Sequence, residues 1–96
     1  MDNKLIPFDM TEYLDSEEAM AEYLSQVLAD GDNEEFLRAI GYIAKAKGMA
    51  KIAKESGLGR ESLYKALRPD AKPRFETVMR VLDALKIQLH ALPKAG

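Results

Sequence analysis

The sequence predicts a mainly helical domain of five helices that ends in a short strand. Three observations lead to this prediction: the chain has 96 residues, 47% of them are hydrophobic, and apolar residues recur at helical spacing along most of its length. A chain of this size can build one small core and is too short for two, so residues 1–96 are predicted to form a single domain. Residues 1–14 are predicted to be an extended N-terminal arm, because Pro7 interrupts a short and mixed pattern.

Two amphipathic helices, residues 16–30 and 33–47, are predicted within the segment 15–48. Each follows an aspartate that has a glutamate three residues later, the spacing of a capping box, and each stops at a glycine. These start signals are Asp15 with Glu18 and Asp32 with Glu35. The apolar stripes are Met20, Tyr23, Leu24, Val27 and Leu28 in the first helix, and Phe36, Leu37, Ile40, Ile43 and Ala44 in the second.

Residues 49–68 have the pattern of a helix-turn-helix, with two short helices joined by a three-residue turn. Such helices cross at a steep angle, so their closest approach needs a small residue and the turn needs one that tolerates positive φ. Ala53 and Gly57 meet these demands, four residues apart. The residues predicted to face the core are Leu58, Leu63 and Ala66. Those predicted to face outward are Arg60, Glu61, Tyr64, Lys65 and Arg68.

The C-terminal part, residues 74–96, is predicted to hold the last helix and a strand. Two prolines make residues 68–73 a loop, and the helix follows at 75–86. Its apolar stripe is Phe75, Val78, Met79, Leu82 and Leu85. Beyond it, residues 87–91 alternate between apolar and polar, a period of two that predicts a strand able to pair with the N-terminal arm or with a second subunit.

The net charge of −2 conceals two oppositely charged parts of the chain, which meet at Leu37. Residues 1–37 hold eleven Asp or Glu and one Lys, whereas residues 38–96 hold thirteen Lys or Arg and five Asp or Glu, which gives −10 and +8. Charges are screened over about 8 Å at physiological salt, so a surface is governed by the charges near it rather than by the total. The basic part can therefore face phosphate while the acidic part faces another partner.

Several function classes are not expected. The chain has no cysteine and one histidine, His90, and its carboxylates lack the spacing of a calcium loop, so no metal ion or other cofactor is expected. Carboxylates at a helix start in water lack the burial that acid–base catalysis requires, so the protein is not expected to be an enzyme. No apolar run reaches the length of a signal peptide or a membrane span, which predicts a cytoplasmic protein.

Three phrases resemble one known family: FDMTEYLDSEEAMAEYL, AIGYIAKAKGMAKIAKESGLGRESLYKAL and FETVMRVLDALKIQL. The segment 49–68 is similar to the helix-turn-helix of the Cro and phage-repressor superfamily, and nearly the whole chain resembles HigA-like addiction module antidote proteins. This resemblance implies a phage-repressor-like fold and a homodimer that binds an operator at its own promoter. It also implies neutralisation of a small basic toxin of the RelE, ParE or HigB kind. Gly59 departs from the family, because a Ser or Thr usually caps the recognition helix there.

The predicted DNA-contacting residues lie on and around the second helix of the motif. Arg60 can donate two hydrogen bonds to O6 and N7 of guanine, Lys65 can reach a base edge or a phosphate, and Glu61 can accept from cytosine N4 or offset Arg60. The remaining predicted contacts are Tyr64 beside them, and Arg68, Lys51, Lys72 and Arg74 around the motif. A plain helical hairpin and an ordinary solvated face of lysines, including Lys45, Lys47 and Lys54, are the alternatives.

The predicted toxin contacts are Glu17, Glu18 and Glu22 on the first helix, because that part of the chain is strongly acidic. The alternative is that these carboxylates only favour the helix N-terminus and solubility. Two other functions stay open at this point. A stand-alone helix-turn-helix repressor would have no toxin partner, and a pure protein-binding module would show no salt-dependent binding to DNA.

Overall fold

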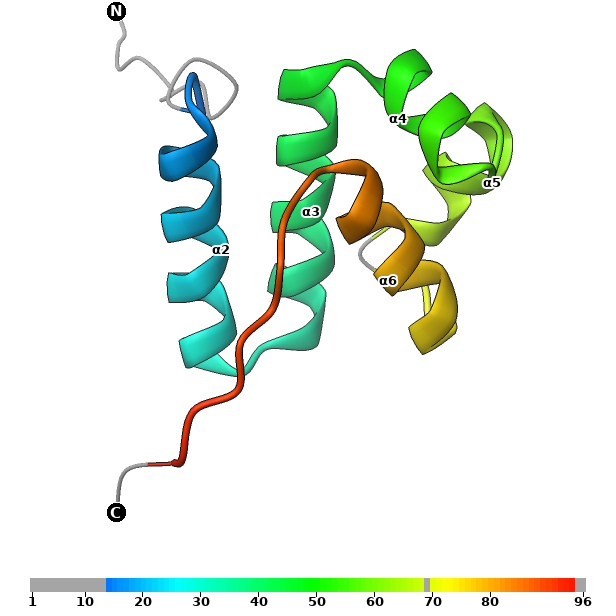
Figure 1. The fold of residues 1–96 in the computed structure, drawn as a ribbon. Coiled ribbons are helices and arrows are strands. Elements are labelled where there is room, and N and C mark those ends of the chain that lie inside the picture. The colour runs from blue at the N-terminus through cyan, green and yellow to red at the C-terminus, as the bar shows by residue number, and fades with distance from the viewer. Residues whose placement is uncertain (1–13, 69, 95–96) are drawn as a thin grey trace, which may run out of the picture.

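The computed structural model describes residues 14–68 and 70–94, which form five helices. They are α2 (Glu17–Asp30), α3 (Asn33–Lys47), α4 (Met49–Ser56), α5 (Arg60–Ala66) and α6 (Phe75–Ala84). Figure 1 shows α2 and α3 side by side and antiparallel, with α4 and α5 beyond α3 and with α6 in front of them. The prediction of a mainly helical chain is therefore confirmed, and the range predicted for α3 agrees with the structure at both ends.

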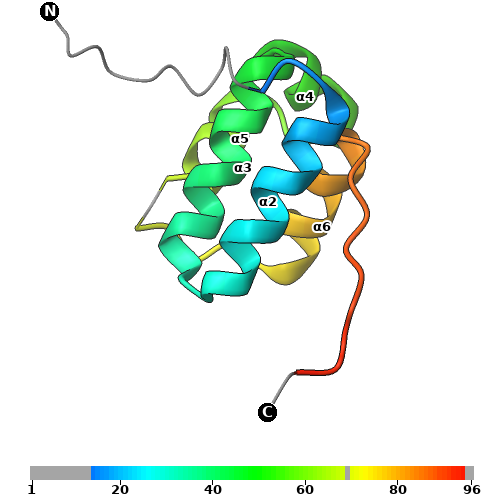
Figure 2. The same ribbon diagram turned by 90° about the vertical axis from the view of Figure 1, so that its left-hand side faces the viewer.

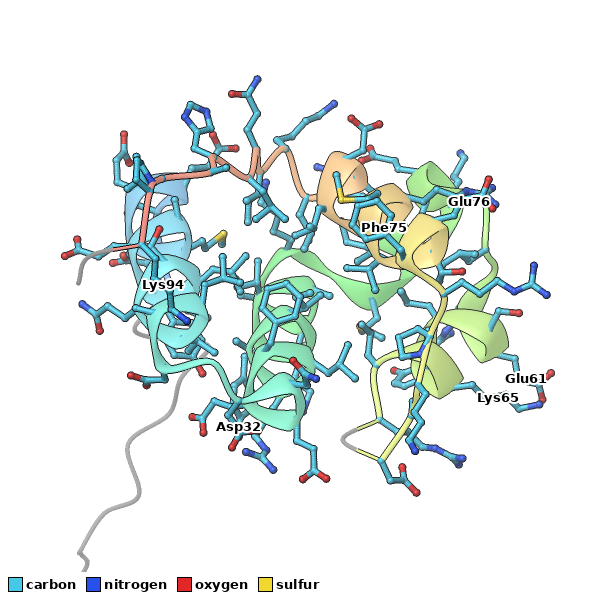
Figure 3. The ribbon with its side chains drawn as sticks, turned by 90° about the horizontal axis from the view of Figure 1, so that it is seen from below. Asp32, Glu61, Lys65, Phe75, Glu76 and Lys94 are labelled. Carbon is cyan, nitrogen blue, oxygen red and sulfur yellow. The ribbon has the colours of Figure 1, made fainter. Side chains whose placement is uncertain are left out.

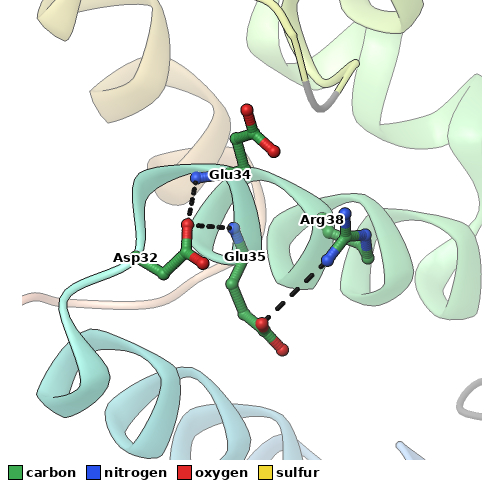
Figure 4. Close-up of polar contacts among 4 residues, drawn as sticks. All are labelled: Asp32, Glu34, Glu35 and Arg38. Atoms are coloured by element: carbon green, nitrogen blue, oxygen red, sulfur yellow. Dashed lines mark hydrogen bonds and ion pairs between the residues drawn. The ribbon is translucent and has the colours of Figure 1, made fainter.

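Side-chain caps fix where the first two helices begin. Ser16 is the N-cap of α2, because its Oγ accepts a hydrogen bond of 3.0 Å from the amide of Ala19. The prediction that Asp15 caps this helix is therefore wrong by one residue. Asp32 caps α3 as predicted: its Oδ1 accepts from the amides of Glu34 and Glu35 at 3.0 and 3.3 Å (Figure 4).

The core lies between α3 and the other helices. Ile40 and Ile43 of α3 are fully buried, and Met20, Leu24 and Val27 of α2 pack on the same cluster. Leu14, at the end of the predicted N-terminal arm, is also buried in the core, while residues 1–13 lie outside the described residues. Leu28 was predicted to join the stripe of α2, and it is 45% exposed instead.

The apolar stripe predicted for α6 is only partly correct. Leu82 and Leu85 are buried as predicted, and Val81 is buried with them, whereas Phe75 is 76% exposed and Met79 is 37% exposed. The reason is the direction from which α6 is covered: it packs chiefly against α4, and the side of the helix that carries Phe75 and Met79 has no helix over it.

The strand predicted at 87–91 is not present in the described part of the chain. α6 ends at Ala84, two residues earlier than predicted, and Lys86 has a left-handed backbone (φ 63°). The amides of Lys86 and Ile87 donate back to Asp83 and Leu82 at 3.0 Å each, which is the Schellman pattern. Figure 2 shows the tail that follows at the outer edge of the molecule on the side of α6. Its period of two arises because Ile87 packs on the core while Gln88 and His90 face solvent, which needs no strand partner.

Candidate functional site

The turn between α4 and α5 has the geometry that the sequence predicts. Gly57 and Gly59 both have positive φ, 79° and 82°. The amide of Gly57 donates to the carbonyl of Lys54, and the amide of Gly59 donates to the carbonyl of Ala53, each at 3.2 Å. Ala53 is buried at 3% exposure, so the small residue lies at the contact between the helices. Side chains with a Cβ adopt this backbone region reluctantly, which explains a glycine at Gly57 and at Gly59.

Leu63 anchors α5 to the body of the protein. Its side chain is fully buried, and Leu67 directly after the helix is 9% exposed, while Leu58 and Ala66 are half-buried. No side chain caps the N-terminus of α5, because Gly59 occupies the cap position. The position of this two-turn helix therefore depends mainly on apolar packing, and its remaining side chains point to solvent.

All eight residues predicted to contact DNA are exposed in the structure. They are Lys51, Arg60, Glu61, Tyr64, Lys65, Arg68, Lys72 and Arg74. Figure 3 shows Glu61 and Lys65 together at the outer edge of α5, on the side of the molecule that faces away from α2. The structure therefore presents one face of α5 to solvent with its charged groups accessible.

The predicted residues divide between two shallow grooves that flank α5. Tyr64 and Arg68 line a groove of about 270 Å³ together with Arg38, Tyr42 and Lys45 of α3. Lys65 and Lys72 line a second groove of about 450 Å³, with Ser62 and Thr77. Cations thus lie on both flanks of α5, which is the distribution needed to hold a helix between two phosphate backbones.

Arg80 is a cation beside α5 that the sequence did not point to. A Cβ placed on Gly57 would lie 2.7 Å from Nη2 of Arg80, so this guanidinium lies directly over the α4–α5 turn. Arg80 belongs to α6 and is exposed. Spacing along the chain could not place it there, because only the packing of α6 on α4 brings the two segments together.

Lys47 has a structural role and is not part of a solvated face. Its Nζ lies 3.2 Å from Oε2 of Glu17 and donates to the carbonyl of Leu85 at 3.0 Å. Its side chain is only 15% exposed, whereas that of Glu17 is 73% exposed, so the ion pair is worth at most about 1 kcal/mol. These contacts join the start of α2 to the ends of α3 and α6, and they occupy one of the three carboxylates predicted to bind a toxin.

The acidic surface lies on α2 and the start of α3. From Leu14 to Leu37 the chain has eight Asp or Glu and no Lys or Arg, and both Glu18 and Glu22 are exposed on α2. Burial raises the pKa of the Tyr23 hydroxyl above its ordinary value of 10.0, so this tyrosine adds no charge to the surface. In Figure 1, α2 lies on one side of α3 and α5 lies on the other. The carboxylates and the cations around α5 therefore occupy different sides of the molecule.

Comparison with known proteins assigns the family. A family model described as "Probable addiction module antidote protein" matches residues 4–93. The chain belongs to this family. An uncharacterized protein of Haemophilus influenzae is 44% identical over 88 residues, which cover 92% of this chain and 91% of that protein. No solved structure gave a significant match. An addiction module antidote implies a cognate toxin as its partner, so the resemblance seen in the sequence is confirmed at the level of the family.

Polar groups of this antidote protein that resemble parts of a catalytic site have structural surroundings. Ser56 is buried, and its hydroxyl donates to the carbonyl of Ala53 and accepts from the amide of Leu58 at the end of α4. His90 is exposed and contacts Gln88, at 3.2 Å. Among residues 14–68 and 70–94, no three Asp, Glu or His side chains gather where they could hold a metal ion. None of the helices in these residues is both long and apolar enough to cross a membrane.

Proposed function

We propose that this protein is the antitoxin of a bacterial type II toxin-antitoxin system and acts in the cytoplasm. In this proposal, α4 and α5 are a helix-turn-helix that binds operator DNA at the protein's own promoter, and the protein represses its own gene. The acidic surface of α2 neutralises a small basic toxin of the RelE, ParE or HigB kind. The observation that carries the proposal is the separation of the exposed cations around α5 from the carboxylates of α2, which lie on different sides of α3.

The chemistry of α5 suits the major groove of DNA. Arg60 is in the first turn of the helix, where side chains of a recognition helix reach base edges, and it can bind O6 and N7 of guanine. Lys65 is five residues further on and contacts a base edge or a phosphate. Lys51, Lys72, Arg74 and Arg80 surround the helix and bind the phosphate backbone in this proposal. A homodimer supplies two such helices, which read a palindromic site.

The chemistry of α2 suits a cationic protein surface. Glu18 and Glu22 are four residues apart and therefore lie on the same side of the helix, with Glu17 at its start. Opposite charges on two proteins steer their association and select the partner. Because Glu17 already pairs with Lys47, we propose that Glu18 and Glu22 contribute more to toxin binding than Glu17 does.

Replacing both Glu18 and Glu22 by lysine is expected to weaken toxin binding by at least about tenfold, because two attractive charges become repulsive. Glu17 is left unchanged so that its contact with Lys47 is preserved. The measurement is a binding titration of the purified cognate toxin, encoded beside this gene in the proposal, against the wild type and the double variant.

The matched control reverses two carboxylates outside the acidic surface. Glu55 at the end of α4 and Asp83 at the end of α6 are exposed, and replacing both by lysine changes the net charge by the same amount. This control is expected to bind toxin as the wild type does. Equal toxin affinity for the Glu18 and Glu22 variant and the wild type would remove α2 from the toxin interface.

A further inference from the structure

We propose that a second copy of this chain docks on the exposed apolar side of α6. The docking surface consists of Leu28, Phe75, Met79 and Leu89, called the α6 patch below. This inference rests on the proposed function in one respect: an antitoxin that reads a palindrome needs two α5 helices, and the α6 patch is where the second subunit attaches. The occupant is this same chain rather than the toxin.

The four residues of the α6 patch form one continuous surface. Their exposures are 45% for Leu28, 76% for Phe75, 37% for Met79 and 38% for Leu89. All four line a groove of about 470 Å³, which Phe36 and Val78 also line. Among the described residues, four of the six large apolar side chains that are exposed thus gather at one groove. Contiguous apolar surface of this kind marks a site of association, whereas single exposed apolar residues do not.

The charges beside the α6 patch favour an identical partner over a cationic one. Residues 87–93 of the tail contain no Asp, Glu, Lys or Arg, so this strip can face its own copy without repulsion between like charges. On α6, Glu76 and Arg80 are exposed and four residues apart. Two antiparallel α6 helices related by a two-fold axis near Val78 bring Glu76 of each copy opposite Arg80 of the other. An isologous interface requires this kind of self-complementary surface.

The position of the α6 patch is compatible with two reading helices on one DNA duplex. Figure 3 shows Phe75 on a different side of the molecule from Glu61 and Lys65, so a partner at Phe75 leaves α5 uncovered. α6 packs directly on α4, which fixes the position of α5 relative to the interface. A two-fold axis beside α6 can therefore turn both α5 helices toward the same duplex, where successive major grooves are about 34 Å apart.

The test is the oligomeric state of the full chain without DNA, measured by sedimentation equilibrium over a range of protein concentrations. The wild type is expected to be a dimer, and Phe75→Asp is expected to raise the dimer dissociation constant by at least about thirtyfold, the size of effect typical of a central interface residue. Phe75 is 76% exposed, so the helical circular dichroism of this variant is expected to be that of the wild type. Ser25→Asp is the control, because it adds the same charge at an exposed position of α2 outside the α6 patch.

A second pair of variants tests the antiparallel arrangement. Glu76→Arg and Arg80→Glu are each expected to weaken the dimer, and the double variant, which exchanges the two charges, is expected to restore it. A monomeric wild type, or a Phe75→Asp variant that dimerises like the wild type, would overturn the inference. Because no DNA is present, the outcome is independent of operator binding: a dimer that depends on Phe75 in a protein that binds no DNA supports this interface and refutes the proposed function.

Discussion

Replacing Leu63 by alanine is expected to lower the free energy of unfolding by about 2–5 kcal/mol, the range for a large side chain removed from a packed core. Leu63 is fully buried, and it is the residue through which α5 is anchored, since no side chain caps the start of that helix. Small domains are stable by only about 5–15 kcal/mol, so this loss is a large share of the total. Equilibrium denaturation in urea measures it.

The neighbouring Ser62→Ala provides the control for Leu63. Ser62 is exposed on the same helix, so its replacement is expected to change stability by less than about 0.5 kcal/mol. A loss below about 1 kcal/mol for Leu63→Ala would mean that α5 is not anchored as the structure describes. DNA binding measured on the destabilised variant is not informative, because a displaced α5 would lose its contacts whether or not it reads bases.

Replacing Arg60 by alanine is expected to cost about 1–3 kcal/mol of operator binding and to relax the preference at one base pair, since a two-donor contact to guanine would be lost. Arg60 is exposed, so the fold is expected to be unaffected. The measurement is footprinting on the protein's own upstream DNA, followed by affinities for a set of operators with single base changes. The helical circular dichroism of the variant checks that α5 remains folded.

Lys72→Ala is the companion variant, because Lys72 lies in the loop after α5 and is proposed to contact phosphate. It is expected to weaken binding to all sequences by a similar factor and to leave the base preference unchanged. If Arg60→Ala also weakened every sequence alike, Arg60 would be a phosphate contact and the proposed base reading would be incorrect.

Elements governed by local chemistry could be predicted from the sequence. The start of α3 depends on Asp32 and the amides that immediately follow it, and the turn before α5 depends on the positive φ of Gly57. Both features are set within a few residues, and both predictions are confirmed. The charge division at Leu37 was visible for a similar reason, because helices placed on two sides of α3 keep the charges of their own segments.

Features that depend on packing between distant segments could not be predicted. The contacts of Lys47 with Glu17 and Leu85, and the place of Arg80 over the turn at Gly57, exist only once three helices have assembled. The apolar spacing of α6 indicated a helix correctly but could not tell which apolar residues the protein itself covers. Phe75 therefore appeared to be a core residue, although it is exposed.

The salt dependence of binding to the protein's own upstream DNA tests whether an acidic chain can hold DNA through a segregated basic surface. Fluorescence anisotropy titrations at several salt concentrations measure it. The wild type is expected to bind, with a logarithm of affinity that falls linearly with the logarithm of salt concentration by roughly 0.9 for each phosphate neutralised. No binding at low salt, or an affinity that does not change with salt, would contradict the role proposed for the cations around α5.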